Sequence, residues 1–216
     1  SEIAPKSLAA AAAAAGEDAA AKPPAAHDVR EAAAAIEGSD DRAVGEALDS
    51  LAKLLPTALA HSGCVEAATW TSMAEALLHL LKDYTLRGAS APVAHLERAL
   101  HAIELVCAQQ DAAHTLVSCG CVEALVVCAA EKLFASGLRR RALVSLLVLL
   151  VAPGAMDRFT ARLAGGQSSG YERVVALLQK PVPLNLLQHL REVCSLVSVW
   201  RSAIRLSALV EGASAA

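Results

Sequence analysis

Gly63-Cys64-Val65-Glu66-Ala67 recurs farther along the chain as Gly120-Cys121-Val122-Glu123-Ala124. Upstream of the two copies lie Arg42-Ala43-Val44 and Arg98-Ala99-Leu100, and the sequence between each start and its pentapeptide has the pattern of an apolar helix. Helix, glycine break and second helix in a fixed order are typical of stacked helical repeats. Such proteins usually bind or brace other macromolecules, so contact surfaces are the first place to look for function.

The composition predicts a fold made of helices alone. Hydrophobic residues make up 55% of the 216 residues but aromatic residues only 3%, so the core must consist mainly of Ala, Leu and Val. Small and aliphatic side chains favour helices and let neighbouring helices approach closely, whereas sheets usually contain more Ile, Thr, Tyr and Phe. No segment prefers strict apolar–polar alternation, and we predict no strands.

Charge and hydropathy restrict the partners. The net charge is −3 and the pI is about 6.2, so the chain lacks the basic excess with which proteins hold a phosphate backbone, and charge does not favour nucleic acid as a partner. The longest strongly apolar run, residues 142–152, is shorter than the roughly 20 residues that span a bilayer as a helix. We therefore predict no membrane span and a buried core helix there.

The chain divides into two predicted parts. Residues 1–27 form a low-complexity, alanine-rich arm with almost nothing large to bury, and we expect a partner to order it. Residues 28–216 are predicted to form one helical-repeat domain with a kink or split at Pro56. Its predicted helices cover residues 28–36, 41–61, 65–86, 92–109, 111–118, 122–134, 138–151, 155–163, 171–179, 184–199 and 201–210.

This arrangement resembles armadillo-type repeats, which are related to HEAT repeats. The best unit, residues 111–152, has Leu116-Val117-Ser118-Cys119-Gly120-Cys121-Val122 as its glycine turn and Arg141-Ala142-Leu143 at the start of its long helix. An earlier unit covers residues 42–109, and a looser one begins at Gly170-Tyr171-Glu172-Arg173-Val174-Val175. The resemblance implies a right-handed α-solenoid of about three irregular units behind the arm, and an irregular helical bundle remains the alternative.

One departure from the family bears on function. Armadillo proteins that grip extended peptides carry a ladder of asparagines flanked by tryptophans on their third helices. Near those positions this chain has Leu105 and Val148, and Asn185 is its sole asparagine. The resemblance therefore implies docking through an apolar or small-residue surface rather than through a peptide groove.

The sequence offers weak candidates for chemistry, and we predict no catalytic residue, metal or cofactor and no enzyme. Cys119-Gly120-Cys121 lacks the matching second pair of a structural zinc site. The six cysteines are scattered, which favours an intracellular reducing compartment, such as the cytoplasm, the cytoskeleton or an organelle matrix. Gly166-Gln167-Ser168-Ser169-Gly170 matches a nucleophile motif that requires a strand before it, so we interpret it as an inter-helix loop.

Five residues are the candidate protein contacts. Arg139 and Arg140 belong to a basic cluster at a helix start, where the helix dipole disfavours cations, so the cluster is either solvated or placed for an acidic partner or RNA. The other three, Trp70, Trp200 and Tyr171, are aromatic side chains of the kind that anchors protein interfaces.

The predicted function is a non-catalytic scaffold or accessory structural subunit that contacts other protein subunits of a large complex. Two alternatives stay open. One is a reversible armadillo-like adaptor or co-chaperone with a single partner. The other is an RNA-associated helical-repeat protein, which the near-neutral charge disfavours.

Overall fold

The computed structural model describes residues 26–36, 38, 40–61, 65–161 and 168–214, and the predicted alanine-rich arm lies almost wholly outside them. Every regular element in these ranges is a helix, which confirms the all-α prediction. The α-helices are α2 (Ala26–Ile36), α3 (Asp41–Ala60), α4 (Ala67–Arg87), α5 (Val93–Val106), α6 (Gln110–Ser118), α7 (Cys121–Ala130), α8 (Ser136–Leu149), α9 (Ala155–Thr160), α10 (Gly170–Leu178) and α11 (Leu184–Ser214), with a 3-10 turn, η2 (Gly88–Ser90), between α4 and α5.

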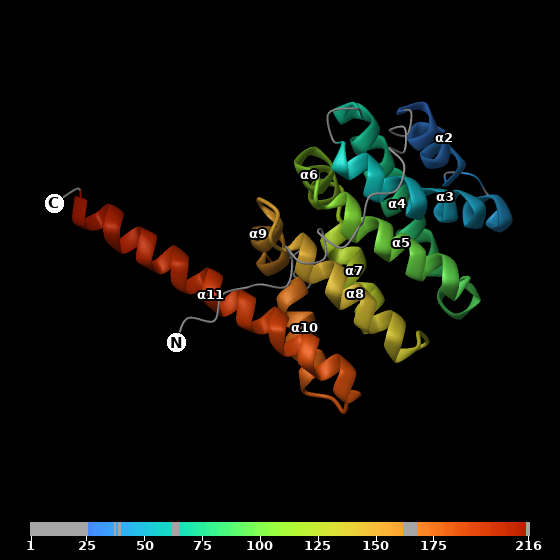
Figure 1. Cartoon of the computed structure of the whole chain (residues 1–216). Helices are drawn as coiled ribbons and strands as arrows, with labels where there is room; N and C mark the ends of the chain where they lie inside the picture. Colours follow the sequence, from blue (N-terminus) through green and yellow to red (C-terminus); the bar gives the residue numbers. More distant parts are fainter. Residues whose placement is uncertain (1–25, 37, 39, 62–64, 162–167, 215–216) are drawn as a thin grey trace, which may run out of the picture.

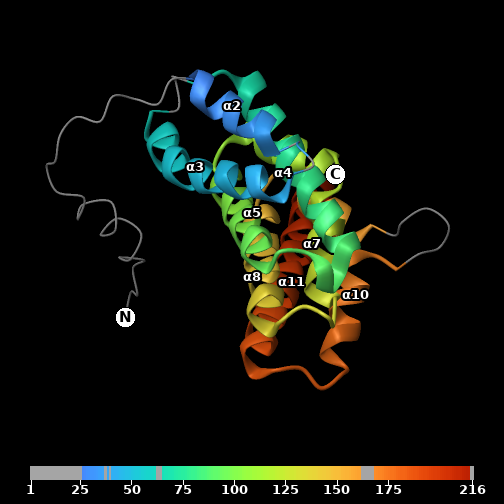
Figure 2. The ribbon, with the colours of Figure 1, turned by 90° about the vertical axis from the view of Figure 1, so that its right-hand side faces the viewer.

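The helices pack in two layers (Figures 1 and 2). In one layer α3, α5, α8 and α11 follow one another, each in contact with the next. In the other layer α2, α4, α7 and α10 do the same, and the pairs α2–α3, α4–α5, α7–α8 and α10–α11 connect the layers. The short helices α6 and α9 both contact α7. In the chain, α6 precedes the pair α7–α8 and α9 precedes the pair α10–α11.

The core is continuous from α2 to α11 and consists almost entirely of aliphatic side chains. Burying a leucine stabilises the fold by about 1.5–3 kcal/mol, so the stacked helices hold together without aromatic clusters. Tyr84 is one of the few aromatic residues in the core, and its hydroxyl lies 3.2 Å from His95 Nδ1. Gly45 on α3 faces the same histidine, and a Cβ there would lie 2.6 Å from His95 Nε2. The glycine therefore permits the close approach of α3 and α5.

Ion pairs connect successive long helices on the outside of one layer. Asp49 on α3 pairs with Arg98 on α5 at 3.0 Å. Arg141 on α8 donates from Nη2 to Glu104 Oε2 on α5 at 3.0 Å, and Ser145 Oγ donates to the other oxygen of Glu104 at 3.0 Å. Arg98 and Arg141 each precede an Ala-Leu pair in the sequence, and each ties its long helix to the preceding long helix.

Gly120 is the junction between α6 and α7. Its φ of +96° is left-handed, which allows α7 to begin at once. Lys82 Nζ donates to the Cys119 carbonyl at 2.8 Å, and Arg158 donates to the Ser118 carbonyl and to Glu123 Oε1, both at 2.7 Å. Cations thus occupy the negative end of the α6 dipole and join α4 and α9 to it.

The two copies of the pentapeptide start their helices at different residues. In the second copy α7 begins directly after Gly120, whereas in the first copy α4 begins at Ala67 with Glu66 as its N-cap. Residues 62–64, which include the first glycine of that copy, lie outside the described residues. The equivalence of the two turns therefore stays a prediction.

The predicted break between residues 199 and 201 was wrong. Helices were expected over residues 184–199 and 201–210, but α11 is continuous from Leu184 to Ser214 because no glycine or proline interrupts it before residue 212. A kink or a split was expected at Pro56. Pro56 does not split α3, which runs through to Ala60. Its ring is exposed, so water can satisfy the backbone carbonyl that loses its helical partner. The sequence left Asp40 and Asp41 as candidate caps of this helix, and Asp40 is the N-cap, since its Oδ1 accepts from the Arg42 backbone N–H at 3.1 Å.

Candidate protein-binding surface

The last helix, α11, is packed along only part of its length. Its 31 residues give it a length of about 46 Å. Leu186, Leu190, Val193 and Val197 are buried where α11 contacts α8 and α10. All side chains from residue 201 to residue 207 are exposed, and Figure 1 shows this half of the helix running out beyond the other helices. We call residues 198–207 the projecting segment.

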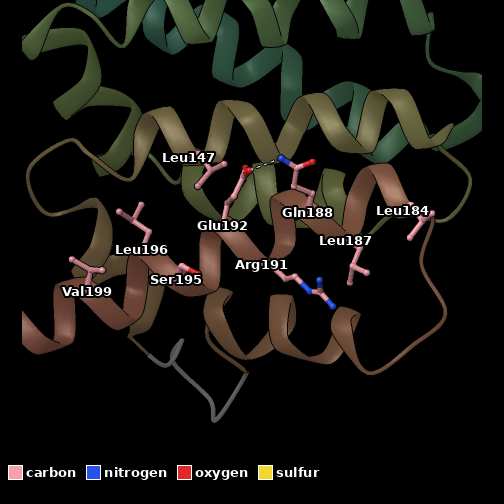
Figure 3. Close-up of a pocket in the computed structure, with 9 residues that line it drawn as sticks. All are labelled: Leu147, Leu184, Leu187, Gln188, Arg191, Glu192, Ser195, Leu196 and Val199. Carbon is pink, nitrogen blue, oxygen red and sulfur yellow. Dashed lines mark hydrogen bonds between the residues drawn. The ribbon is translucent and has the colours of Figure 1, made fainter. Parts of the chain in front are cut away.

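A groove follows the packed half of α11 where it lies beside α8. Its volume is about 740 Å³. Figure 3 shows Leu147 pointing from α8 toward a row formed by Gln188, Glu192 and Leu196, while the Arg191 side chain points away from α8. We call this the α8–α11 groove, and its lining residues are Leu147, Leu184, Leu187, Gln188, Arg191, Glu192, Ser195, Leu196 and Val199.

The apolar lining continues onto the projecting segment. A second, shallower hollow is lined by Ser198, Val199, Ser202, Ala203 and Leu206, so Val199 belongs to both. Val199 is 67% exposed and Leu206 is 63% exposed. Their spacing places them with Ala203 on one side of the helix. Exposed apolar surface is a common feature of protein interaction sites, so this surface is the candidate.

The charged groups around this surface are mainly cationic. Glu192 accepts hydrogen bonds from His189 at 2.8 Å and from Gln188 at 3.0 Å, and these bonds, that from His189 first, lower the pKa of its carboxyl. Arg201 stacks over the Tyr171 ring at 4.8 Å. Among the described residues neither Arg191 nor Arg205 has an ion pair, so both remain available to an acidic group of a partner.

The structure separates the five predicted contact residues. Trp200 is half-buried at the point where α11 leaves the body, and Tyr171 contacts both Arg201 and the edge of Phe159, so these two aromatic residues belong to the α10–α11 end. Arg140 is exposed on α8.

The other two have structural roles. Arg139 donates from Nε to the Ala129 carbonyl at 2.8 Å and so completes the end of α7. Trp70 is only 3% exposed and lies in the core between helices, which leaves no ring surface for a partner.

Sequence reasoning missed the leucines and valines that line the α8–α11 groove. Leu184, Leu187, Leu196 and Val199 have the same type and spacing as the residues that are buried on α5 and α8, which lie between two other long helices of this layer. Local sequence does not distinguish the two groups, because exposure depends on tertiary packing.

The candidates for chemistry have structural explanations in the described part of the chain. Ser169, from the nucleophile-like motif, is the N-cap of α10 and forms a capping box with Glu172. Cys121 and Cys128 are buried, and burial raises the pKa of both thiols, that of Cys128 to about 12. Within the described ranges no three His, Cys, Asp or Glu side chains are grouped so that they could hold a metal ion.

Comparison with protein-family models, with curated proteins and with solved structures found no match for this chain. The described helices also include none that is individually long and apolar enough to cross a membrane. Only the pair α6–α7 reaches that length and hydropathy when the two helices are joined across their 68° bend. No similar protein therefore indicates a function, and the exposed surface of α11 is the feature from which one can be proposed.

Proposed function

We propose that this chain is a non-catalytic scaffold or accessory structural subunit of a larger multiprotein assembly and acts through protein–protein contacts. The observation that supports this most strongly is the projecting segment, an exposed helix whose apolar side continues from the α8–α11 groove. An isolated helix of about ten residues is marginal in water, and exposed Val199 and Leu206 lower its solubility further. A partner that covers this side would stabilise the helix and bury its exposed apolar side chains.

The packing supports the armadillo-like interpretation of the repeat pattern. In the proposal, α4–α5, α7–α8 and α10–α11 are the second and third helices of three irregular units, and α6 and α9 are the short first helices of the last two. Within each layer, helices contact one another in chain order, and sequential contacts of this kind support the proposal of an α-solenoid. Such an array buries its internal faces and leaves its last helix for a neighbour.

The test is affinity purification of the tagged full-length protein from its native source, followed by measurement of the mass and stoichiometry of the recovered species. We expect a complex of fixed composition with the wild-type protein. The double variant Val199→Glu/Leu206→Glu should release the partners, because a carboxylate placed in an apolar contact costs several kcal/mol to bury.

Leu86→Glu is the matched control, since Leu86 is 88% exposed but lies on α4, far from the α11 surface in the chain. It should retain the complex. Recovery of the wild-type protein as a free monomer, or equal loss of partners in both variants, would contradict the proposal.

A further inference from the structure

Formal charge is distributed unevenly along the molecule. Residues 26–60, which include α2 and α3, contain seven acidic and three basic side chains, a formal charge of −4. Residues 168–207, which include α10 and most of α11, contain five basic and two acidic side chains, a formal charge of +3. The two helix pairs lie at opposite ends of the molecule (Figure 1). One end is therefore acidic and the other basic.

The acidic end contains a groove between α2 and α3 with a volume of about 560 Å³. Small side chains form its floor, and a floor of this kind lets another helix approach to an interaxial distance of about 8–10 Å. Its charged lining residues are three carboxylates and one lysine. We call this the α2–α3 groove, and its lining residues are Asp28, Glu31, Ala32, Ala35, Ala43, Glu46, Ala47, Ser50, Lys53 and Leu54.

The basic end presents the projecting segment. Val199, Ala203 and Leu206 form its apolar stripe, at the i, i+4 and i+7 spacing of one helix side. Arg201 and Arg205 are exposed on the same ten residues, and no acidic side chain occurs among them. The segment is thus a basic amphipathic helix with small and aliphatic residues on its apolar side.

We infer that the projecting segment of one molecule docks into the α2–α3 groove of a second copy, so that molecules associate head to tail. An apolar ridge then meets a groove floored by alanines, and a basic helix meets an acidic rim. Pairing two projecting segments with each other would instead place two segments of the same positive charge side by side, which like-charge repulsion disfavours. A contact between two different surfaces of one chain leaves a free surface at each end of a dimer, so it generates open chains unless the rotation between copies closes a ring.

This inference rests on the proposed protein-contact function and names a second copy as one occupant of the projecting segment. The first test is sedimentation velocity of the purified full-length chain over a range of concentrations. We expect monomer, dimer, trimer and higher species in succession. The association should weaken as ionic strength rises, because the Debye length falls from about 10 Å at 0.1 M to about 3 Å at 1 M salt.

Two variants each remove one half of the contact. Asp28→Lys/Glu31→Lys reverses the charge of the groove and keeps the projecting segment, whereas Val199→Glu/Leu206→Glu damages the segment and keeps the groove. Each variant alone should raise the concentration needed for association at least about tenfold, because reversed charges or a buried carboxylate oppose the contact. All four changed side chains are exposed, and circular dichroism at equal concentration checks that both variants are folded.

The decisive experiment mixes the two variants. The intact segment of the groove variant fits the intact groove of the segment variant, so the mixture should form a 1:1 dimer that does not grow further. A groove variant that dimerises by itself would overturn the inference, because that result means contact between two projecting segments. So would a wild-type protein that remains monomeric at 22.2 kDa in low salt up to about 1 mM.

The outcomes separate this inference from the proposed function. A wild-type protein that is monomeric when pure, but whose complex in the native source is lost with Val199→Glu/Leu206→Glu, overturns head-to-tail association and leaves the scaffold proposal standing. A pure protein that forms salt-sensitive chains, with the 1:1 dimer in the mixture, supports the inference whatever other subunits are recovered.

Discussion

At the scale of single residues, Gly120 sets the direction of the chain between α6 and α7. Its φ of +96° lies in a region that costs other L-residues about 1–2 kcal/mol. A Cβ at this position would lie 3.4 Å from Glu123 Oε2 and 3.5 Å from Arg158 Nη2, which are ordinary van der Waals distances. The need for glycine here therefore comes from the backbone conformation of the turn.

We predict that Gly120→Ala lowers the free energy of unfolding by about 1–2 kcal/mol, measured by urea titration. Gly137→Ala is the matched control, because a Cβ at Gly137 meets nothing within 4 Å and its φ is not positive. Alanine in that helix should leave stability unchanged or raise it by up to about 1 kcal/mol. Equal losses in the two variants would contradict the role assigned to Gly120.

The buried thiols predict a pH dependence of stability. Burial raises the pKa of Cys107 and of Cys128 from 9.0 to about 12, and it raises that of Cys121 as well. The folded state then holds these protons more tightly than the unfolded state. Their contribution to stability is fully present below pH 9 and is lost as the pH rises from 9 toward 12.

The free energy of unfolding, measured by urea titration, should therefore decrease as the pH rises from 9 to 11. The slope should be up to about 1.4 kcal/mol per pH unit for each thiol. Cys128→Ala should make this slope shallower even though it also lowers stability at pH 7. Cys119→Ala, at an exposed cysteine, is the comparison, and it should retain the wild-type slope. A slope that Cys128→Ala leaves unchanged would refute the assignment.

At the scale of single elements, α11 combines a structural half and a projecting half. We predict that removing residues 201–216 changes the free energy of unfolding by less than about 1 kcal/mol, because residues 201–207 are exposed and their one described aromatic contact is Arg201 over Tyr171. Leu190→Ala, in the buried half, should cost about 2–5 kcal/mol. Thermal unfolding of both proteins checks this, and a truncated chain that unfolds like Leu190→Ala would contradict the division of α11.

Most helix positions could be predicted from the sequence, because apolar spacing and the glycine and proline breaks act locally. The prediction for α6 differs from the structure by one residue, and residue type alone limited the cap of α3 to Asp40 or Asp41, of which Asp40 is the N-cap. The break at residue 200 was wrong, since a tryptophan followed by an arginine is compatible with a continuing helix. Helix ends without a glycine or proline depend on packing, which local pattern does not contain.

At the scale of the whole molecule, exposure is the property that sequence could not supply. Trp70 and Trp200 have the same side chain, yet Trp70 on α4 is buried in the hydrophobic core and Trp200 is half-buried where α11 leaves the body. Arg139 and Arg140 are neighbours, yet one completes the end of α7 and the other is exposed. Which residues become a surface is set by tertiary packing, which local sequence does not contain.

The proposed function requires the projecting segment to be a protein contact. The size of the protein in a fresh extract from its native source tests this most directly. Size-exclusion chromatography with mass detection should place the tagged wild-type protein well above its monomer mass of 22.2 kDa. Val199→Glu/Leu206→Glu should shift it to the monomer, while Leu86→Glu should leave it unchanged. A wild-type protein that elutes as a free monomer would contradict the account.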